Sequence, residues 1–291
     1  MTGRPDLDPP CAAVGVVGLG LIGGSIALRV RGTWPEMRVV GVDRRRVIQD
    51  AVRAGVIHDY RTSLAELADC DLVVLAVPVP AILELIEEAG VERLPLVVTD
   101  VGSTKRVIMG AAARAGVLNF VGGHPMAGAE HAGIAHARAD LFEGRPWLLV
   151  GGDTDRSEAL ELVERFVRGL GAEPRRIDAA AHDRTMAYVS HVPQLVASAL
   201  MATAGQRCGR AGLGASGPAF TEMTRIAASP FDTWRGTLAT NADFVVEALE
   251  AFVARLPAPA ALREGSDLSM LFAEAQRWRA ELVAATAPGS A

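Results

Sequence analysis

The sequence that decides the fold of this 291-residue chain is Val14-Gly15-Val16-Val17-Gly18-Leu19-Gly20-Leu21-Ile22-Gly23. The valine-rich run predicts a buried strand, and the glycines that follow at G-x-G-x-x-G spacing open a helical pattern. Gly18 permits a tight turn, Gly20 lets a pyrophosphate approach the backbone, and Gly23 lets the helix pack closely on the strand. The phosphates then lie at the helix N-terminus, where free N–H groups attract negative charge. We therefore expect a dinucleotide on the loop of Gly18, Leu19, Gly20, Leu21, Ile22 and Gly23.

A second predicted strand, at 38–42, is followed by Asp43, which lies 20 residues beyond Gly23. A carboxylate at that place accepts hydrogen bonds from the adenosine ribose and repels the 2′-phosphate of NADP. Arg44 to Arg46 follow directly, and a guanidinium can pair with that phosphate, although at least two of the three fit a solvated helix start better. We predict NAD as the cofactor, with Asp43 and Arg44 beside it, and leave NADP open.

The hydrophobic pattern divides the chain in two. From 12 to 178, short runs of Val, Ile and Leu alternate with helical patterns, which is typical of a parallel sheet covered on both faces. From 179 to about 285 the periodicity is helical throughout. We expect an α/β, Rossmann-like doubly wound parallel sheet, the dinucleotide-binding domain, and then an all-helical domain for substrate binding and dimerisation. The expected strands are 13–17, 38–42, 72–76, 96–100, 118–121, 146–150 and 174–177.

Composition narrows the possible partners. The 34 acidic and 29 basic residues give a formal charge of −5, which leaves no general footprint for nucleic acid or anionic lipid. The most apolar stretches contain prolines or are shorter than the ~18 residues of a membrane span. Cys11, Cys70 and Cys208 form no disulfide or zinc pattern, and residues 1–11 do not resemble a signal peptide. We expect a cytoplasmic protein with a small-molecule substrate and no metal.

Candidate chemical groups follow the predicted strands, because ligands of open parallel sheets collect at the carboxyl ends of the strands. Val77 and Pro78 follow one strand, Ser103 follows the next, and His124 follows the one after. An imidazole titrates near neutrality and can take a proton from a substrate hydroxyl while hydride leaves the same carbon. We predict His124 as the base and Ser103 as a hydrogen-bond partner of that hydroxyl, although a serine here also suits a helix cap.

Five motifs in order carry a family resemblance: G-L-G-L-I-G-G-S (18–25), D-V-G-S-T-K (100–105), H-P-M-A-G-A-E (124–130), S-H-V-P (190–193) and R-I-A-A-S-P-F-D-T-W (225–234). With them, the region from about 13 to 255 resembles the prephenate/arogenate (cyclohexadienyl) dehydrogenase family. The resemblance implies NAD-dependent oxidative decarboxylation of a cyclohexadienyl ring to 4-hydroxyphenylpyruvate or tyrosine, in aromatic amino acid biosynthesis. It also implies a homodimer formed through the helical domain.

The resemblance assigns roles to individual residues. It gives the catalytic histidine to His124 and the hydroxyl-binding serine to Ser103, in agreement with the pattern above. Arg225 matches an arginine that holds a substrate carboxylate, which suits the fork of a guanidinium. The other substrate-binding candidates that it implies are Glu130, His182, His191 and Trp234. His182 and His191 are nine residues apart, so a regular helix places them on opposite faces, and we expect at most one to meet the ligand.

Two departures from the family pattern lie in the substrate half. Gln194 stands where the family commonly has a second histidine, and Pro218 interrupts a stretch that is usually rich in glycine. Gln194 lies one helical turn from His191, so it can face the same ligand, and it offers a donor and an acceptor but no positive charge. We expect altered specificity and leave three substrates open: prephenate, arogenate and 4-amino-4-deoxyprephenate, the amine analogue used in secondary metabolism.

Other proteins combine a dinucleotide domain with helices. The β-hydroxyacid dehydrogenases and pyrroline-carboxylate reductases do so, and a non-catalytic dinucleotide sensor is a further alternative. His124, in its H-P-M-A-G motif, and Arg225 argue against the two enzyme classes. The joint presence of Ser103, His124 and Arg225 argues against the sensor.

Overall fold

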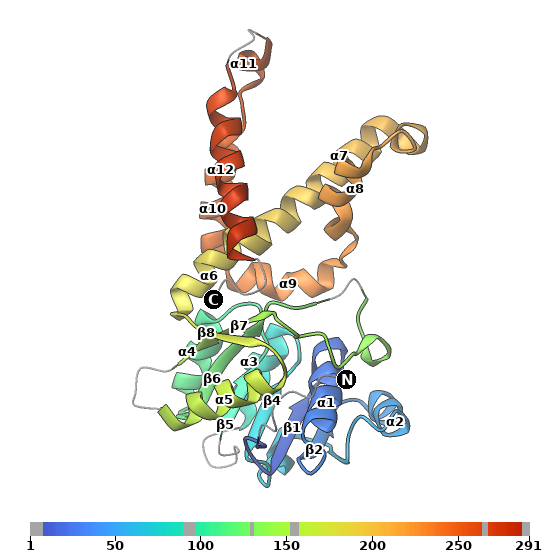
Figure 1. The fold of residues 1–291 in the computed structure, drawn as a ribbon, viewed down its shortest axis with the longest axis vertical. Coiled ribbons are helices and arrows are strands. Elements are labelled where there is room, and N and C mark those ends of the chain that lie inside the picture. The colour runs from blue at the N-terminus through green and yellow to red at the C-terminus, as the bar shows by residue number, and fades with distance from the viewer. Residues whose placement is uncertain (1–7, 90–96, 129–130, 152–156, 264–266, 287–291) are drawn as a thin grey trace. The chain divides into compact units, whose positions relative to one another are not determined.

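The computed structural model describes residues 8–89, 97–128, 131–151, 157–263 and 267–286. It consists of two compact units, Met1–Val245 and Val246–Ala291. The first unit contains an eight-stranded sheet and the helices up to α9, and helix α10 crosses from the first unit into the second (Figure 1). Among the described residues, no helix combines the length and apolar character that a membrane span requires.

The sheet has the strand order β3-β2-β1-β4-β5-β6-β7-β8. All neighbouring strands are parallel except β6 and β7, which are antiparallel. Antiparallel neighbours need no crossover helix, and the described part of the chain between β6 and β7 contains only a short 3-10 turn, Ile134–His136. The strands are β1 (Ala13–Val17), β2 (Arg38–Val42), β3 (Asp59–Arg61), β4 (Leu72–Leu75), β5 (Val97–Asp100), β6 (Phe120–Pro125), β7 (Pro146–Val150) and β8 (Glu173–Arg176).

Helices cover both faces of this sheet, which confirms the doubly wound fold. One hydrophobic cluster packs Ile26, Ile48 and Phe166, from α1, α2 and α5, against one face. A second cluster packs Ile82 and Ile108, from α3 and α4, against the other face. The helices of this unit are α1 (Leu21–Thr33), α2 (Arg45–Arg53), α3 (Val79–Ala89), α4 (Arg106–Arg114), α5 (Ser157–Gly169), α6 (Ala179–Met186), α7 (Val192–Leu213), α8 (Pro218–Thr224) and α9 (Phe231–Thr240).

The expected strands agree closely with the observed ones, with two differences. The strand predicted at 118–121 lies two residues later and extends to Pro125, so that His124 belongs to β6 itself. The three-residue edge strand β3 was not predicted, because Asp59, Tyr60 and Arg61 lack the buried apolar alternation that marks a strand. The antiparallel β7 is a departure from the expected all-parallel sheet.

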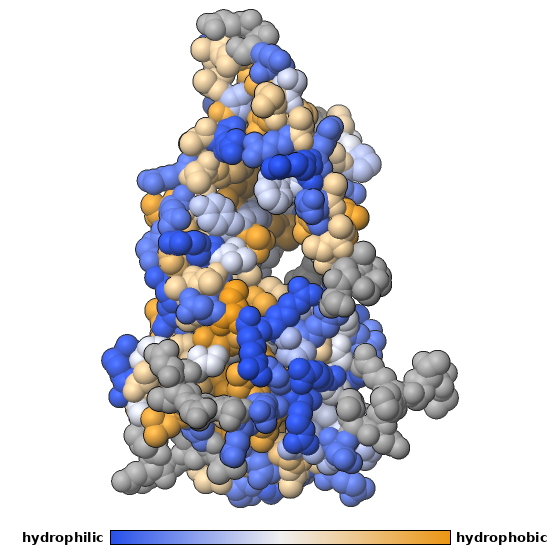
Figure 2. All heavy atoms as spheres, turned by 60° about the vertical axis from the view of Figure 1, so that its left-hand side comes forward, coloured by the Kyte–Doolittle hydropathy of each residue, from blue (hydrophilic) through white to orange (hydrophobic). Residues whose placement is uncertain are grey.

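The second unit is helical and exposes many apolar side chains. Arg255, at the end of α10, pairs with Glu274 on α12. Helix α12 has no buried residue, and Met270, Phe272 and Trp278 on it are exposed. Figure 2 shows hydrophobic side chains, in orange, interspersed with hydrophilic ones at the molecular surface. The helices here are α10 (Ala242–Arg255), α11 (Pro259–Arg263) and α12 (Ser269–Ala285).

Candidate active site

The glycine loop has the backbone that a phosphate cradle needs. Gly18 has φ of 91°, in the region that favours glycine. A Cβ at Gly23 would lie 1.9 Å from the Gly18 carbonyl oxygen, so the turn and α1 pack without room for a side chain. A Cβ at Gly20, in contrast, would meet no atom of the described residues within 4 Å, and no side chain caps α1 there. The open space before uncapped N–H groups fits a pyrophosphate.

Asp43 ties the end of β2 to this loop. Its Oδ2 accepts a hydrogen bond from the Leu19 backbone N–H at 2.6 Å, and its Oδ1 accepts one from the Arg44 N–H at 2.6 Å. The Arg44 side chain is exposed, with its Nε 3.9 Å from Asp43 Oδ1. Val77 lies against the loop, because a Cβ at Gly18 would be 2.7 Å from its Cγ1, whereas Pro78 is exposed.

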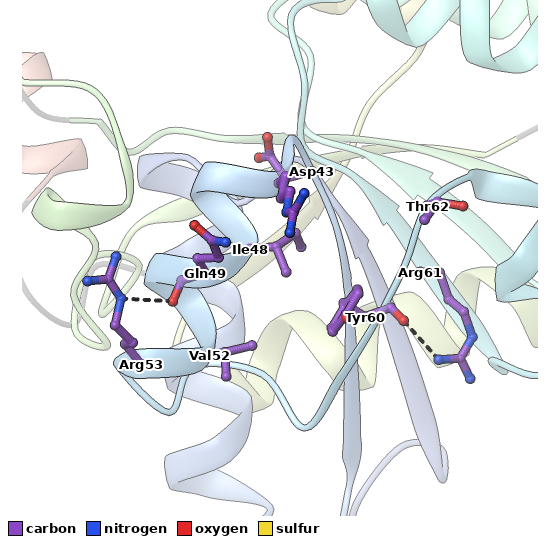
Figure 3. A pocket seen from close by; sticks show the side chains of 9 residues that line it. Asp43, Ile48, Gln49, Val52, Arg53, Tyr60, Arg61 and Thr62 are labelled. Atoms are coloured by element: carbon purple, nitrogen blue, oxygen red, sulfur yellow. Dashed lines mark hydrogen bonds between the residues drawn. The ribbon is translucent and has the colours of Figure 1, made fainter.

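A pocket of about 850 Å³ opens beside Asp43 (Figure 3). Helix α2 contributes Ile48, Gln49 and Val52 to one wall, and Tyr60 and Thr62 line another. The volume lies within the range of small-molecule sites, and the lining combines apolar and hydrogen-bonding side chains. Asp43, whose carboxylate is expected to bind the ribose, lines this pocket.

The loop that carries Ser103 is fixed to the strand that carries His124 by a buried ion pair. The Asp100 carboxylate accepts hydrogen bonds from the N–H groups of Gly102, at 2.7 Å, and Gly123, at 3.0 Å, and pairs with Lys105 Nζ. Lys105 Nζ also donates to the Gly123 carbonyl oxygen at 2.7 Å. Asp100 and Lys105 are fully buried, and Lys105 is the only lysine in the sequence. Ser103 itself is half-buried.

His124 belongs to a chain of three hydrogen-bonded side chains. Its Nδ1 lies 2.9 Å from His182 Nε2, and His182 Nδ1 lies 2.8 Å from Asp183 Oδ1. Burial, and then the neighbouring His182, Lys105 and His191, lower the pKa of His124 well below its ordinary value. The imidazole of His124 is therefore neutral at neutral pH, which is the form that can accept a proton.

Asp183 is fully buried and nevertheless ionised. Burial raises the pKa of Asp183, but hydrogen bonds from His182 and from the backbone N–H groups of Arg106 and Lys105 outweigh it and lower the pKa below its ordinary value. These N–H groups lie at the start of α4, 2.7 Å (Lys105) and 3.0 Å (Arg106) from the carboxylate. The chain from His124 thus ends on an anion.

Asn241 extends this network to His191. Its Nδ2 donates to the Asp183 carbonyl oxygen at 2.8 Å and lies 3.3 Å from His191 Nδ1. His191 is buried, its ring meets the Trp234 ring edge-on with centroids 6.1 Å apart, and burial lowers its pKa to about 4. Within the described residues, His191 Nε2 has no hydrogen-bond partner. A buried polar atom of this kind requires a hydrogen-bond partner, which a ligand or an ordered water can supply.

Gln194 is hydrogen-bonded to the turn that carries Arg225. Gln194 Nε2 donates to the Ile226 carbonyl oxygen at 3.0 Å and to Ser198 Oγ at 3.2 Å. Arg225 begins the 3-10 turn Arg225–Ala228, and its side chain is exposed. Glu130, which we expected at the substrate, lies outside the described residues.

The structure corrects two expectations about the histidines. His182 was expected to bind substrate, but it is fully buried and its two ring nitrogens contact His124 and Asp183, which leaves neither for a ligand. His182 and His191 were expected on opposite faces of a regular helix. A π-helical segment, Ala187–His191, interrupts the helix between them, and both join one network through Asp183 and Asn241.

Comparison with known proteins identifies the family. The nucleotide-binding domain model of prephenate dehydrogenase matches residues 26–175, and its dimerization domain model matches residues 178–273. A prephenate dehydrogenase of Lactococcus lactis subsp. cremoris is 34% identical over 246 residues, which cover 81% of this chain and 67% of the relative. The chain belongs to the prephenate dehydrogenase family.

Two further relatives cover nearly the whole chain. A cyclohexadienyl dehydrogenase of Zymomonas mobilis subsp. mobilis is 28% identical over 92% of this chain and 95% of its own length. The crystal structure of prephenate dehydrogenase from A. aeolicus, in complex with hydroxyphenyl propionate and NAD+, has a TM-score of 0.84 and 29% identity. It covers 93% of this chain and 98% of that chain. Membership in the prephenate dehydrogenase family excludes the β-hydroxyacid dehydrogenases and pyrroline-carboxylate reductases.

Three residues of this chain that hold the Ser103 loop and the His124 hydrogen bonds in place were not predicted from the sequence. They are Asp100, Lys105 and Asp183. Asp100 and Lys105 stand at the two ends of D-V-G-S-T-K, yet charged residues at the end of a predicted strand and in the loop after it resemble a solvated turn. Asp183 directly follows His182, and this adjacency was the available signal. A carboxylate next to a histidine on an apolar helix is a candidate partner for that ring.

Proposed function

We propose that this protein catalyses the NAD-dependent oxidative decarboxylation of a cyclohexadienyl acid, prephenate or arogenate, to the aromatic product. The observation that carries the proposal is the position of the His124 imidazole, on the strand next to the Ser103 loop, with Nδ1 2.9 Å from His182 Nε2. Family membership and likeness to an NAD+-bound relative support the reaction class and the cofactor.

The cofactor site is proposed from four features of this chain. The N-terminus of α1, with Gly18, Gly20 and Gly23, would hold the pyrophosphate, and Asp43 would accept hydrogen bonds from the adenosine ribose. Arg44 and the pocket beside Asp43 would receive the rest of the adenosine. Val77 and Pro78 would border the bound dinucleotide. NAD supplies the hydride acceptor.

His124 would act as the general base. It takes the proton from the ring C4 hydroxyl as hydride leaves C4, and Ser103 donates a hydrogen bond to the same oxygen. The electron pair of the bond to the ring carboxylate moves into the ring, carbon dioxide leaves, and the ring becomes aromatic, and the C4 oxygen takes the proton back from His124. The ion pair of Asp100 and Lys105 would hold the Ser103 loop and β6 in register during this step.

Substrate recognition is proposed for the helical side of the site. The unpartnered Nε2 of buried His191 would donate to a polar group of the ring substrate, and Trp234 would hold the His191 ring. Arg225 would pair with a carboxylate of the substrate. Gln194 would hold the turn that carries Arg225 through its hydrogen bond to the Ile226 carbonyl oxygen. Glu130, at the end of the motif that begins at His124, would also bind the substrate.

We also propose a homodimer formed through the helical region of 179–285, beyond the dinucleotide-binding domain of 12–178. The match to a dimerization domain and the exposed apolar side chains of α12 support it. A cytoplasmic location is proposed as well, since Cys11, Cys70 and Cys208 are free thiols. Sedimentation of the purified protein tests the dimer.

The deciding experiment follows NADH and NADPH formation with prephenate, arogenate and 4-amino-4-deoxyprephenate in parallel. We expect turnover with prephenate or arogenate, and faster turnover with NAD than with NADP. His124→Asn should lower kcat by ~10²–10⁴ with NAD affinity unchanged, as expected for loss of a general base. Binding of NAD without turnover of any of the three would overturn the proposal in favour of a dinucleotide sensor. A preference for 4-amino-4-deoxyprephenate would contradict prephenate and arogenate as substrates, and His124 would then accept its proton from the C4 amine.

A further inference from the structure

We infer that Asp183 and His182 form a positioning pair that fixes the proton of His124 on Nδ1 and so presents the Nε2 lone pair to the substrate. The inference deepens the proposed function, because it rests on His124 as the base of that reaction. In this inference His182, which was first expected at the substrate, and Asp183 both act through His124.

The direction of the first hydrogen bond follows from Asp183. The carboxylate oxygens accept from the N–H groups of Lys105 and Arg106 and from Arg106 Nε at 3.3 Å, and Oδ1 lies 2.8 Å from His182 Nδ1. The backbone N–H groups and the guanidinium can only donate, so the carboxylate is ionised and can only accept. The proton between Asp183 and His182 therefore sits on His182 Nδ1.

The second hydrogen bond follows from the first. A His182 ring that holds its single proton on Nδ1 has a bare Nε2, which can only accept. The contact of 2.9 Å to His124 then requires the proton to sit on His124 Nδ1. The remaining ring nitrogen of His124, Nε2, carries the lone pair, as a general base needs. The positive charge that develops when His124 takes a proton is passed along two hydrogen bonds toward the Asp183 anion.

Asp183 is itself held by the start of α4 and by Asn241, which makes the tautomer a fixed property of the fold. The start of α4, directly after the Ser103 loop, donates two N–H groups to it. Asn241 anchors its backbone carbonyl, and the residue is fully buried. One carboxylate thus links the orientation of His124 to the loop that carries Ser103.

The first test measures the tautomer directly and needs no turnover. Long-range 1H–15N spectra of protein labelled with [15N]histidine distinguish Nδ1–H from Nε2–H rings among the six histidines of the chain. His124→Asn identifies the signals of that ring. We expect His124 to be neutral with its proton on Nδ1 at pH 7.5, with and without NAD. A His124 ring protonated on Nε2, or a positively charged one, would overturn the inference even if the enzyme turns over.

The second test is kinetic and uses a matched pair of variants at His182. In His182→Gln the amide oxygen can still accept from His124 Nδ1–H, whereas His182→Leu has no acceptor. We expect His182→Leu to lose on the order of 10²-fold in kcat with little change in KM, and His182→Gln to stay within about tenfold of the parent. Both variants keep Asp183 and its contacts with α4.

Asp183→Asn provides a third test, again through kcat. The amide puts an NH2 group where donors already converge, so His182 loses the acceptor that fixes its tautomer, and kcat should fall by ~10²–10⁴. Equal kcat in His182→Leu, His182→Gln and the parent, in folded protein, contradicts the positioning role. A parent enzyme that turns over no cyclohexadienyl substrate contradicts the proposed function instead, and the tautomer measurement still decides the inference.

Discussion

At the scale of single residues, Gln194 was expected to bind the substrate, but its side chain also makes hydrogen bonds within the protein. Both amide hydrogens are used inside the protein, on Ile226 and Ser198. Because a backbone carbonyl can only accept, the NH2 end must face Ile226, and only Oε1 is left for a ligand. A lone acceptor suits a substrate with an N–H donor better than one with only oxygens, so the residue bears on the choice between arogenate and prephenate.

Gln194→Leu should raise the KM of the cyclohexadienyl substrate by about tenfold, with a smaller effect on kcat. The change leaves the Ile226 carbonyl without its donor, and an unsatisfied buried acceptor costs about 1–3 kcal/mol, here felt in the turn that carries Arg225. Steady-state kinetics with saturating NAD measure the effect. Ser198→Ala is the control, since it removes only the longer of the two hydrogen bonds of Gln194. An unchanged KM in Gln194→Leu would show that Gln194 does not support the turn that carries Arg225.

The pair of Lys105 and Asp100 makes a second prediction at this scale. Lys105→Met should lower the free energy of unfolding by about 3–5 kcal/mol, because it leaves the Asp100 carboxylate buried without its cation. Urea denaturation followed by circular dichroism measures the loss. The double variant Asp100→Asn/Lys105→Met should recover part of it, since no charge is then buried alone. A double variant as unstable as the single one would show that packing, and not charge, is what Lys105 provides.

At the scale of elements, strands were easier to predict than their surroundings. Buried runs such as those of β1 and β2 are readily predicted as strands, because a short continuous run rich in β-branched residues favours few other structures. The antiparallel β7 could not be predicted, since a strand pattern carries no direction. The π-helical segment Ala187–His191 could not be predicted either, because its one-residue register shift leaves no hydrophobic signature. His124 and Ser103 followed from strand ends, whereas Asp183 needed the fold.

The glycine loop gives the prediction that belongs to this scale. Gly20→Ala should leave thermal stability unchanged and weaken NAD binding by tenfold or more. Its Cβ meets no atom of the described protein but occupies the space where a phosphate would approach. Gly23→Ala is the contrasting variant: its Cβ would lie 1.9 Å from the Gly18 oxygen, so the melting temperature itself should fall. Thermal unfolding with and without NAD separates the two, and normal NAD binding by Gly20→Ala would place the pyrophosphate elsewhere.

At the scale of the whole molecule, the buried imidazole of His191 and the half-buried imidazole of His124 make stability depend on pH. Burial lowers the pKa of His191 to about 4 and that of His124 well below its ordinary value. In the unfolded chain both return to about 6.5, so the unfolded state binds more protons below that pH. Stability is therefore complete above about pH 6.5 and falls as the pH drops toward 4. For His191 alone the loss reaches about 3 kcal/mol.

Urea denaturation at a series of pH values between 8 and 4 measures this dependence. His136→Asn, at an exposed position, is the control and should leave the curve unchanged. A free energy of unfolding that stays constant from pH 7 to pH 4.5 would mean that the two imidazoles are open to solvent in the native protein.

The single lysine has a practical consequence for chemistry performed on this protein. Reagents that acylate lysine side chains find no exposed target on the folded molecule, since Lys105 is fully buried and is the only lysine in the sequence. Acylation of Lys105 requires an opening that exposes the centre of the sheet, so its rate measures how often such openings occur.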